Sequence, residues 1–420
     1  MIKNSESNPD AIHAIVTCPD ETKEVLAAEL RALGANDVEL RYRAVACSVP
    51  DIETFYELHL KLRTASRIFR IVKEFAAHTE QMLADQAKRI RWADWFSPER
   101  TFLVEGVPAD RGPGVMGSNA ISKTIRESLQ AAFAQHTGKI PKVDLKDPKV
   151  IVVAFIQKGR CTLSLDTTGK TLHKRGYRTE GHPAPIKETL ACAILDLAGY
   201  DGTQPLLDPM CGSGTIAIEA AYKALHKAAH IHRKKGEFGF EWLRDFDNDI
   251  WRKVSDRVRG ERLESLPAPI VASDISEKYV EMARENALRA RVERDIEFKA
   301  ERIQDARPHA ETGLLIANLP YGARLSKGDD EALETLYEEI GNNLKKNFKG
   351  WRAALLVAED SPWKFIGLKS TRRIPIMNGS IPAKLLIYDM YAGTKRKPRA
   401  SEESDSDPFI QSIKDEMKNI

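Results

Sequence analysis

The sequence lacks the features that mark membrane and secreted proteins. None of its apolar runs reaches the roughly 20 residues that a membrane-spanning helix needs. The first ten residues, MIKNSESNPD, are polar and contain no apolar signal segment. We therefore expect a cytoplasmic globular protein without a membrane partner.

Clustered metal ligands and cysteine pairs are also missing. The five cysteines contain no CxxC pair and are scattered along the chain: Cys18, Cys47, Cys161, Cys192 and Cys211. This distribution favours reduced thiols over disulfides or a zinc site. His226 and His230 lie one helical turn apart and His232 follows, but no acid or cysteine completes a ligand set. We expect no bound metal.

The chain is too long for one ordinary core. Its 420 residues favour two or three domains, and its hydrophobic content of 42% is that of a globular protein. The net charge of +3 is small, so only local clusters of charge can indicate a nucleic-acid partner.

The first part of the sequence alternates short strand-like and helix-like segments. Residues 1–10 are expected to form a flexible leader, and small α+β units follow as far as residue 166. Within them, residues 51–75 show apolar residues at helical spacing. This spacing predicts a long helix with Arg63, Arg67 and Arg70 on its other face.

The second part has a different pattern. A polar connector at 167–185 is followed by strands alternating with helices over 186–392, which predicts a parallel sheet covered on both faces. The connector suggests that residues 1–165 can be removed without loss of cofactor binding. Residues 393–420 carry a basic run and then an acidic run, and by composition they form a disordered tail.

The segment LLDPMCGSGTIAIEAA at 206–221 carries the clearest chemical signal. An apolar strand ends at Asp208, a turn containing Gly212 and Gly214 follows, and a helix begins directly after it. Glycines let the backbone approach a ligand closely, and the helix start offers free N–H groups. The segment matches neither a Walker loop nor a GxGxxG dinucleotide motif.

Acidic residues follow two further strands. Asp274 ends IVASD, where a carboxylate can accept hydrogen bonds from ribose hydroxyls, although an N-cap role is the structural alternative. The gap from the glycine turn exceeds the usual ~20 residues, because residues 223–268 intervene. An acid near an adenine amino group is expected at Glu301 or Asp305, and the sequence does not choose between them.

The segment GLLIANLPYGARL places Asn318, Leu319, Pro320 and Tyr321 after another apolar strand. NLPYG is also a good β-turn sequence. Together with the glycine segment, however, it resembles the [DN]-P-P-[YFW] motif of methyltransferases that act on exocyclic base amines. The departure from this motif is Leu319, where proline is usual.

By this resemblance, Asn318 and the Leu319 carbonyl each accept one N–H of the amine and orient its lone pair. Pro320 stiffens the loop and Tyr321 stacks on a flipped base. The DPMCGSGT string resembles motif I of class I S-adenosyl-L-methionine-dependent methyltransferases. The resemblance implies a set of cofactor-binding residues: Asp208, Pro209, Cys211, Gly212, Gly214, Thr215, Asp274, Glu301, Asp305 and Asn318.

Two further segments narrow the family. Residues 163–178 and 184–195 resemble the joint between a THUMP RNA-binding domain and the catalytic domain of bacterial 23S rRNA guanine-N2 methyltransferases. The resemblance implies an α/β protein with a ferredoxin-like subdomain at 11–75, a THUMP domain at 76–166 and a Rossmann-like methyltransferase domain at 186–392. RNA contacts are expected from two groups of cations: Arg63, Arg67 and Arg70, and Lys174, Arg175 and Arg178.

The resulting prediction is an enzyme that methylates N2 of guanosine in RNA, with 23S rRNA as the expected substrate. A tRNA guanine-N2 methyltransferase and a catalytically silent RNA-binding ribosome assembly factor are the alternatives. The intact Asp208, Gly212, Gly214 and Asn318 favour an enzyme over the silent factor.

Overall fold

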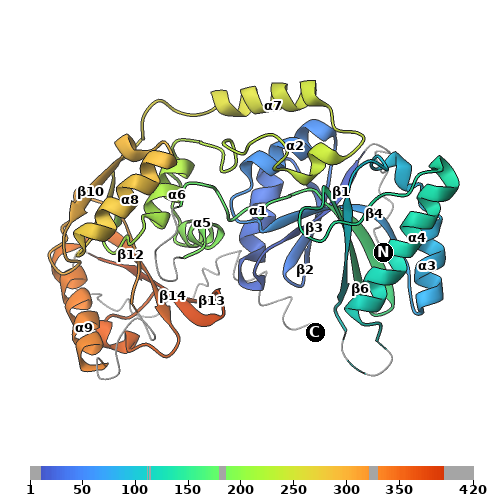
Figure 1. The fold of residues 1–420 in the computed structure, drawn as a ribbon. Helices are drawn as coiled ribbons and strands as arrows, with labels where there is room; N and C mark the ends of the chain where they lie inside the picture. Colours follow the sequence, from blue (N-terminus) through green and yellow to red (C-terminus); the bar gives the residue numbers. More distant parts are fainter. Residues whose placement is uncertain (1–10, 111, 113–114, 179–185, 321–329, 392–420) are drawn as a thin grey trace, which may run out of the picture. The chain divides into compact units, whose positions relative to one another are not determined.

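A computed structural model describes residues 11–110, 112, 115–178, 186–320 and 330–391 (Figure 1). The predicted leader, the predicted tail, part of the connector and Tyr321 lie outside the described residues. Two seven-stranded sheets organise the described chain, one formed before the connector and one after it.

The N-terminal sheet has the strand order β2-β3-β1-β4-β7-β6-β5. Its strands are β1 (Ile12–Thr17), β2 (Asn36–Arg41), β3 (Ala44–Val49), β4 (Arg67–Ala76), β5 (Phe102–Pro108), β6 (Val150–Gln157) and β7 (Arg160–Asp166). All neighbours are antiparallel except β5 and β6. Because β4 pairs with β7, the α+β units before and after residue 76 share one continuous sheet.

The helices of this part are α1 (Lys23–Ala32), α2 (Ile52–Lys61), α3 (Glu80–Lys88) and α4 (Ser118–Thr137). Gly34, just after α1, and Gly138, the C-cap of α4, both have left-handed backbone angles, with φ of +85° and +69°. Glycine adopts this conformation without strain, so both helices end where a glycine permits a sharp turn.

The predicted long helix over residues 51–75 is wrong. Asp51 caps α2 by accepting a hydrogen bond from the Thr54 N–H, and the helix ends at Lys61. The following RIFRIVKEF segment is rich in β-branched and aromatic residues, and it pairs with β1 and β7 as strand β4. Side chains three residues apart on a strand point to opposite faces, so Arg67 and Arg70 share no face.

The C-terminal sheet has the strand order β10-β9-β8-β11-β12-β14-β13. Its strands are β8 (Leu206–Asp208), β9 (Ile270–Asp274), β10 (Ile296–Ala300), β11 (Gly313–Asn318), β12 (Trp351–Ala358), β13 (Arg372–Asn378) and β14 (Ile381–Asp389). Strands β10, β9, β8, β11 and β12 run parallel to one another. β14 is antiparallel to β12, and β13 is antiparallel to β14.

Helices cover both faces of this sheet, as the sequence predicted. They are α5 (Glu188–Leu197), α6 (Thr215–Ala224), α8 (Glu277–Arg289) and α9 (Asp330–Asn347). Leu206 packs in one apolar cluster with α5, α6 and α8, and its neighbour Leu207 packs in another with α9. This alternation along β8 buries the sheet on both sides.

The segment between α6 and β9 packs on the N-terminal core. Phe238, Phe240 and Leu243 belong to the same apolar cluster as the N-terminal strands, and α7 (Asn248–Gly260) contacts α2. The Phe240 ring lies 4.8 Å from the Tyr56 ring and 4.7 Å from the His59 ring. Because this core is shared, removing residues 1–165 would expose it. The structure therefore argues against the expectation that these residues can be removed without loss of cofactor binding.

Within the described ranges, no helix combines the length and the apolar character that crossing a membrane requires.

The shared core generates a stability prediction. Phe240→Ala should lower the free energy of unfolding by about 3–5 kcal/mol, since it removes a buried aromatic ring and leaves a cavity. Phe365→Ala is the matched control, because Phe365 is 44% exposed and its loss should cost under about 0.5 kcal/mol. Urea denaturation followed by circular dichroism measures both. Equal midpoints for the two variants would contradict the shared core.

Candidate active site

Four neighbouring parallel strands bring polar side chains to one edge of the C-terminal sheet. Asp208 ends β8, Asp274 ends β9, Glu301 directly follows β10, and Asn318 ends β11. The chain runs from β8 outward to β9 and β10 and then crosses back to β11 on the other side of β8. Such a reversal of strand order is where open parallel sheets bind ligands, at the carboxyl ends of the strands.

The glycine turn between β8 and α6 has a backbone that favours glycine. Gly212 and Gly214 have φ of +50° and +81°. A Cβ on Gly214 would lie 2.9 Å from the Cβ of Ala283 on α8, so a larger residue would displace that helix. The Cys211 N–H donates to the Ser273 carbonyl at 2.8 Å, which ties the turn to β9. Thr215 then begins α6, so this helix start faces the strand ends.

Asp208 is a buried carboxyl group without a well-formed hydrogen bond. Its exposure is 0%, and neither oxygen accepts a hydrogen bond of normal geometry from a described residue, although the backbone N–H groups of Met210 and Ala217 lie close enough to act on its charge. Burial raises the pKa of Asp208 to about 8 against the opposing effect of these two N–H groups, and the negative charge of Asp274 adds to the rise. A buried polar group left unsatisfied costs free energy, so its persistence points to a donor or a cation that binds here.

Asp274 is positioned by two backbone amides. Its Oδ2 accepts from the Gly212 N–H and its Oδ1 from the Ser276 N–H, each at 3.0 Å. Ser276, and not Asp274, occupies the N-cap of α8. Each carboxylate oxygen has more than one acceptor site, so both remain able to accept from hydroxyl groups.

Glu301 and Asp305, the two candidates for the acid near the adenine amino group, have different surroundings in the structure. Glu301 is half-buried, and its N–H donates to the Asp274 carbonyl at 3.0 Å. Asp305 is exposed, four residues further along the chain. Glu301 is therefore the acid that lies next to Asp274.

The NLPY segment begins with an amide oxygen that has no partner among the described residues. Asn318 Oδ1 is buried and accepts no hydrogen bond from the described residues. The Leu319 N–H donates to the Leu356 carbonyl on β12 at 3.0 Å, and the Leu319 side chain is fully buried with the α9 residues. This burial explains why a leucine is tolerated where the motif has proline. The Pro320 carbonyl accepts from the Tyr337 hydroxyl at 3.2 Å.

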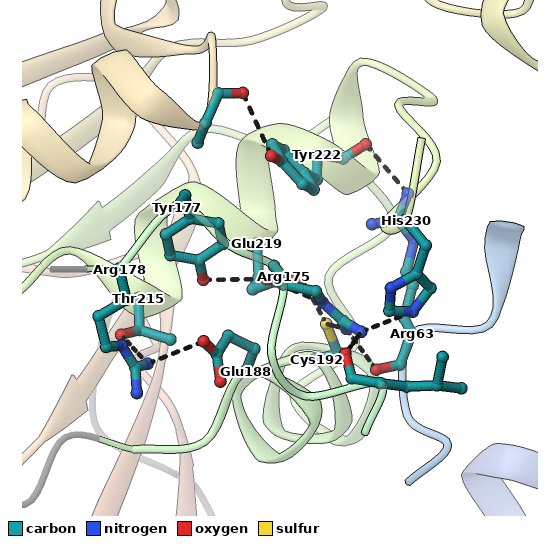
Figure 2. A network of polar contacts seen from close by, with 12 residues as sticks. Arg63, Arg175, Tyr177, Arg178, Glu188, Cys192, Thr215, Glu219, Tyr222 and His230 are labelled. Atoms are coloured by element: carbon teal, nitrogen blue, oxygen red, sulfur yellow. Dashed lines mark hydrogen bonds and ion pairs between the residues drawn. The ribbon is translucent and has the colours of Figure 1, made fainter. Parts of the chain in front are cut away.

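The connector holds the start of α6 (Figure 2). Arg178 Nη2 donates to the Thr215 hydroxyl at 2.9 Å and to the Ile186 carbonyl at 2.8 Å, and it lies 3.5 Å from the Glu188 carboxylate. The predicted cofactor residue Thr215 and the predicted RNA residue Arg178 are thus in direct contact.

Arg175, which was predicted to contact RNA, is buried in the protein. Its side chain is 0% exposed and lies 3.4 Å from the equally buried carboxylate of Glu219 on α6. Burial by itself would lower the pKa of Arg175, but the negative charge of Glu219 has the larger effect and raises this pKa. The guanidinium also donates to the Arg63 and Leu172 carbonyls, each at 2.6 Å. All of these partners belong to the protein.

The other predicted RNA residues are dispersed. Arg63 donates to the Tyr222 and Lys227 carbonyls at 3.1 and 2.7 Å, which occupies its Nη2. Arg67 pairs with Asp166, and Arg70 pairs with Asp245. Lys174 is exposed. Arg67 and Lys174 line one cavity, whereas Arg63 and Arg70 lie outside it, and contact of all four with RNA stays a prediction.

Glu219 is a buried residue of the site that was not predicted from the sequence. It lies in the apolar segment TIAIEAA, where a single carboxylate among buried residues is the signal that could have revealed it. Besides Arg175, it accepts from the Tyr177 hydroxyl and the Cys192 thiol, both at 3.0 Å (Figure 2).

No group of three metal-ligating side chains gathers in the described part of the chain. His230 is buried, and its Nε2 lies 2.9 Å from Arg175 and 3.1 Å from the Leu62 carbonyl.

The sequence matches three families of protein domain. Residues 175–387 match the methyltransferase domain of the RMKL-like family, residues 77–166 match the THUMP domain, and residues 13–69 match the RlmL ferredoxin-like domain.

Two relatives agree with these matches. The provisionally named RNA methyltransferase slr0064 of Synechocystis is 34% identical over 367 residues, covering 87% of this chain and 94% of that protein. Ribosomal RNA large subunit methyltransferase K/L of Methylococcus capsulatus is 34% identical over 382 residues, covering 89% of this chain. This chain spans only 50% of that second relative, so it matches about half of the longer protein.

A solved structure shares the fold over almost the whole chain. The crystal structure of SMU.472, provisionally named a methyltransferase and complexed with SAH, has a TM-score of 0.82 and 28% sequence identity. The similarity covers 92% of this chain and 100% of that one. The predicted α/β fold class, with ferredoxin-like and THUMP parts before a Rossmann-like class I methyltransferase domain, is confirmed. The chain belongs to the RMKL-like methyltransferase family.

Proposed function

We propose that the protein transfers a methyl group from S-adenosyl-L-methionine to N2 of a guanosine in RNA, with 23S rRNA as the substrate. The observation that carries the proposal is the unpartnered Asn318 Oδ1 at the end of β11, next to the strand that leads into the glycine turn. An acceptor in this position suits an exocyclic amine beside a nucleoside cofactor.

The residues at the strand ends fit the cofactor. The glycine turn lets the backbone approach closely, the buried Asp208 oxygens suit a positively charged group, and Asp274 suits the ribose hydroxyls. Glu301, next to Asp274, suits the adenine amino group. When bound, S-adenosylmethionine supplies an electrophilic methyl group on its sulfonium. SMU.472 is complexed with the corresponding product, which supports this cofactor.

The NLPY segment orients the amine. A guanine amine conjugated to its ring is a poor nucleophile, so its lone pair must be aimed. Asn318 Oδ1 accepts one N–H, and the Leu319 carbonyl, which accepts no hydrogen bond from a described residue, takes the second. The methylated nitrogen is strongly acidic and loses its proton to water, so the site needs no strong general base.

RNA is supported as the substrate by the THUMP match at 77–166 and by the names of the relatives, an RNA methyltransferase and a ribosomal RNA methyltransferase. Methylation of tRNA and a silent assembly role are the competing proposals. The test incubates the full chain with transcribed 23S rRNA, transcribed tRNA and deuterated cofactor, and then analyses the nucleosides by mass spectrometry. Labelled N2-methylguanosine from 23S rRNA alone is expected. Label only in tRNA, label in adenosine, or no label would overturn the proposal.

The amine acceptor generates a kinetic prediction. Asn318→Ala should lower the single-turnover rate by about 10²–10³, because the contact is made to the amine as it reacts. Affinity for cofactor and for RNA should stay within about twofold of wild type. Asn342→Ala, at an exposed position on α9, is the control. A near wild-type rate in Asn318→Ala would show that NLPYG is only a β-turn without a role in methyl transfer.

Asp208 generates a prediction that depends on pH. Because its folded pKa lies near 8, above the ordinary value of 3.8, the folded cofactor-free protein holds an extra proton between these values. Wild-type stability should therefore fall across this window by up to about 1.4 kcal/mol per pH unit. Asp208→Asn should match wild type near pH 4 and be more stable above pH 8, while binding the cofactor more weakly.

Thermal unfolding from pH 4 to 9 and calorimetry with S-adenosylmethionine measure the two effects. Asp360→Asn, at an exposed position, is the matched control and should change neither. A variant that is no more stable than wild type at pH 8.5, or one that retains wild-type cofactor affinity, would contradict the role given to Asp208.

A further inference from the structure

A cavity lies beside the connector. Its volume is about 640 Å³, and the connector from Lys170 to Tyr177 lines it together with residues 232–237 of the segment after α6. Arg67 of β4 and Arg289 at the end of α8 complete its wall. Four parts of the chain that are distant in sequence therefore meet around one cavity.

The cavity is strongly basic. Seven of its lining residues are lysine or arginine, and Glu237 is the one carboxylate among them. Four of the cations have acidic partners in the described structure: Arg67 with Asp166, Lys170 with Glu237, Arg175 with Glu219, and Arg289 with Glu285. Lys174, Arg233 and Lys234 form no ion pair with a described residue, so the cavity retains uncompensated positive charge.

Arg233 is held in place by neutral groups. Its guanidinium donates to the carbonyls of Thr168, Lys170 and Thr171 at 2.6–2.9 Å, and it lies 4.8 Å above the Phe238 ring. Burial and the charge of Arg175 lower the pKa of Arg233 to about 10, so it stays protonated at neutral pH. A fixed cation without an acidic partner attracts an anion more strongly than a flexible paired one.

Neutral donors stand beside these cations. The Thr171 hydroxyl is buried and has no hydrogen-bond partner among the described residues. The His232 side chain is exposed, yet partial desolvation and the positive charges around it, of which Lys227 contributes most, lower its pKa to about 4. A neutral imidazole and a hydroxyl among cations can each donate one hydrogen bond to an oxygen anion.

We propose that this cavity is a phosphate-binding site that holds the backbone of the RNA substrate, with Lys174, Arg233 and Lys234 as its principal cations. The proposal rests on the proposed function, because RNA is the polyanion that the enzyme would methylate. Tyr222, in the cavity wall, lies about 10 Å along α6 from Thr215 at the glycine turn. The site therefore holds phosphates that flank the target nucleotide, and it acts on affinity and not on the chemical step.

The test compares two double variants of the full chain with equal changes in charge. Lys174→Gln with Lys234→Gln removes two cavity cations whose side chains are exposed, so the fold should persist. Lys346→Gln with Lys349→Gln removes two exposed lysines near the end of α9, outside the cavity. Binding of transcribed 23S rRNA is measured from 50 to 200 mM KCl, together with the single-turnover rate at saturating RNA and binding of inorganic phosphate alone.

The cavity variant should lose about tenfold in RNA affinity at 100 mM salt, and its slope of log affinity against log salt should become shallower by about 1.5. The control variant should match wild type, and the rate at saturating RNA should be unchanged in both. Equal affinities and slopes in the two variants would overturn the proposal. Loss of inorganic phosphate binding with unchanged RNA affinity would also overturn it, because the cavity would then bind a small anion and not the RNA backbone. An enzyme that binds RNA through the cavity but transfers no methyl group would instead overturn the proposed function.

Discussion

The buried ion pair between Arg175 and Glu219 is the contact on which the candidate site depends. Both side chains are fully buried, and Glu219 lies on α6, the helix that begins at the glycine turn. Through its other donors, Arg175 binds the carbonyls of Arg63, from the N-terminal part, and Leu172, from the connector. Removing one partner of such a pair typically costs 3–5 kcal/mol, because the other is left as an uncompensated buried charge.

This contact relates the chemistry to substrate capture. α6 carries Thr215 at its start and Glu219 one turn later, while the connector binds them with Arg178 and Arg175. The same connector forms one wall of the basic cavity. RNA held there would therefore lie against the segment that positions the glycine turn. The connector would then link the bound RNA directly to the edge of the sheet where the cofactor binds.

Much of the catalytic half was predictable from its sequence. Strands such as β9 and β11 are short apolar runs that end in a polar residue, so the pattern indicates both the strand and the site residue. β13 lacks this pattern, because Pro375 and two arginines make its sequence look like a loop. Proline is tolerated in that strand because it lies at the sheet edge.

The incorrect predictions share a physical cause. Contacts between residues distant in sequence determine the structure where the local sequence pattern fits more than one conformation or environment. The RIFRIVKEF segment has an apolar spacing compatible with a helix, but pairing with β1 and β7 makes it a strand. From the sequence, Arg175 was expected to face solvent, because its partner Glu219 is 44 positions away along the chain. Likewise, the aromatic residues around Phe240 follow the first strand and helix of the catalytic sheet but complete the N-terminal core.

We propose that the carboxyl ends of β8 to β11 hold the cofactor and the reacting amine. A crystal structure of the full chain with S-adenosylhomocysteine tests this arrangement most directly. We expect the ribose hydroxyls on Asp274, the adenine amino group by Glu301, and the sulfur facing Asn318. A cofactor product bound away from these residues, or Asn318 Oδ1 turned away from its sulfur, would show that the strand ends are not the active site.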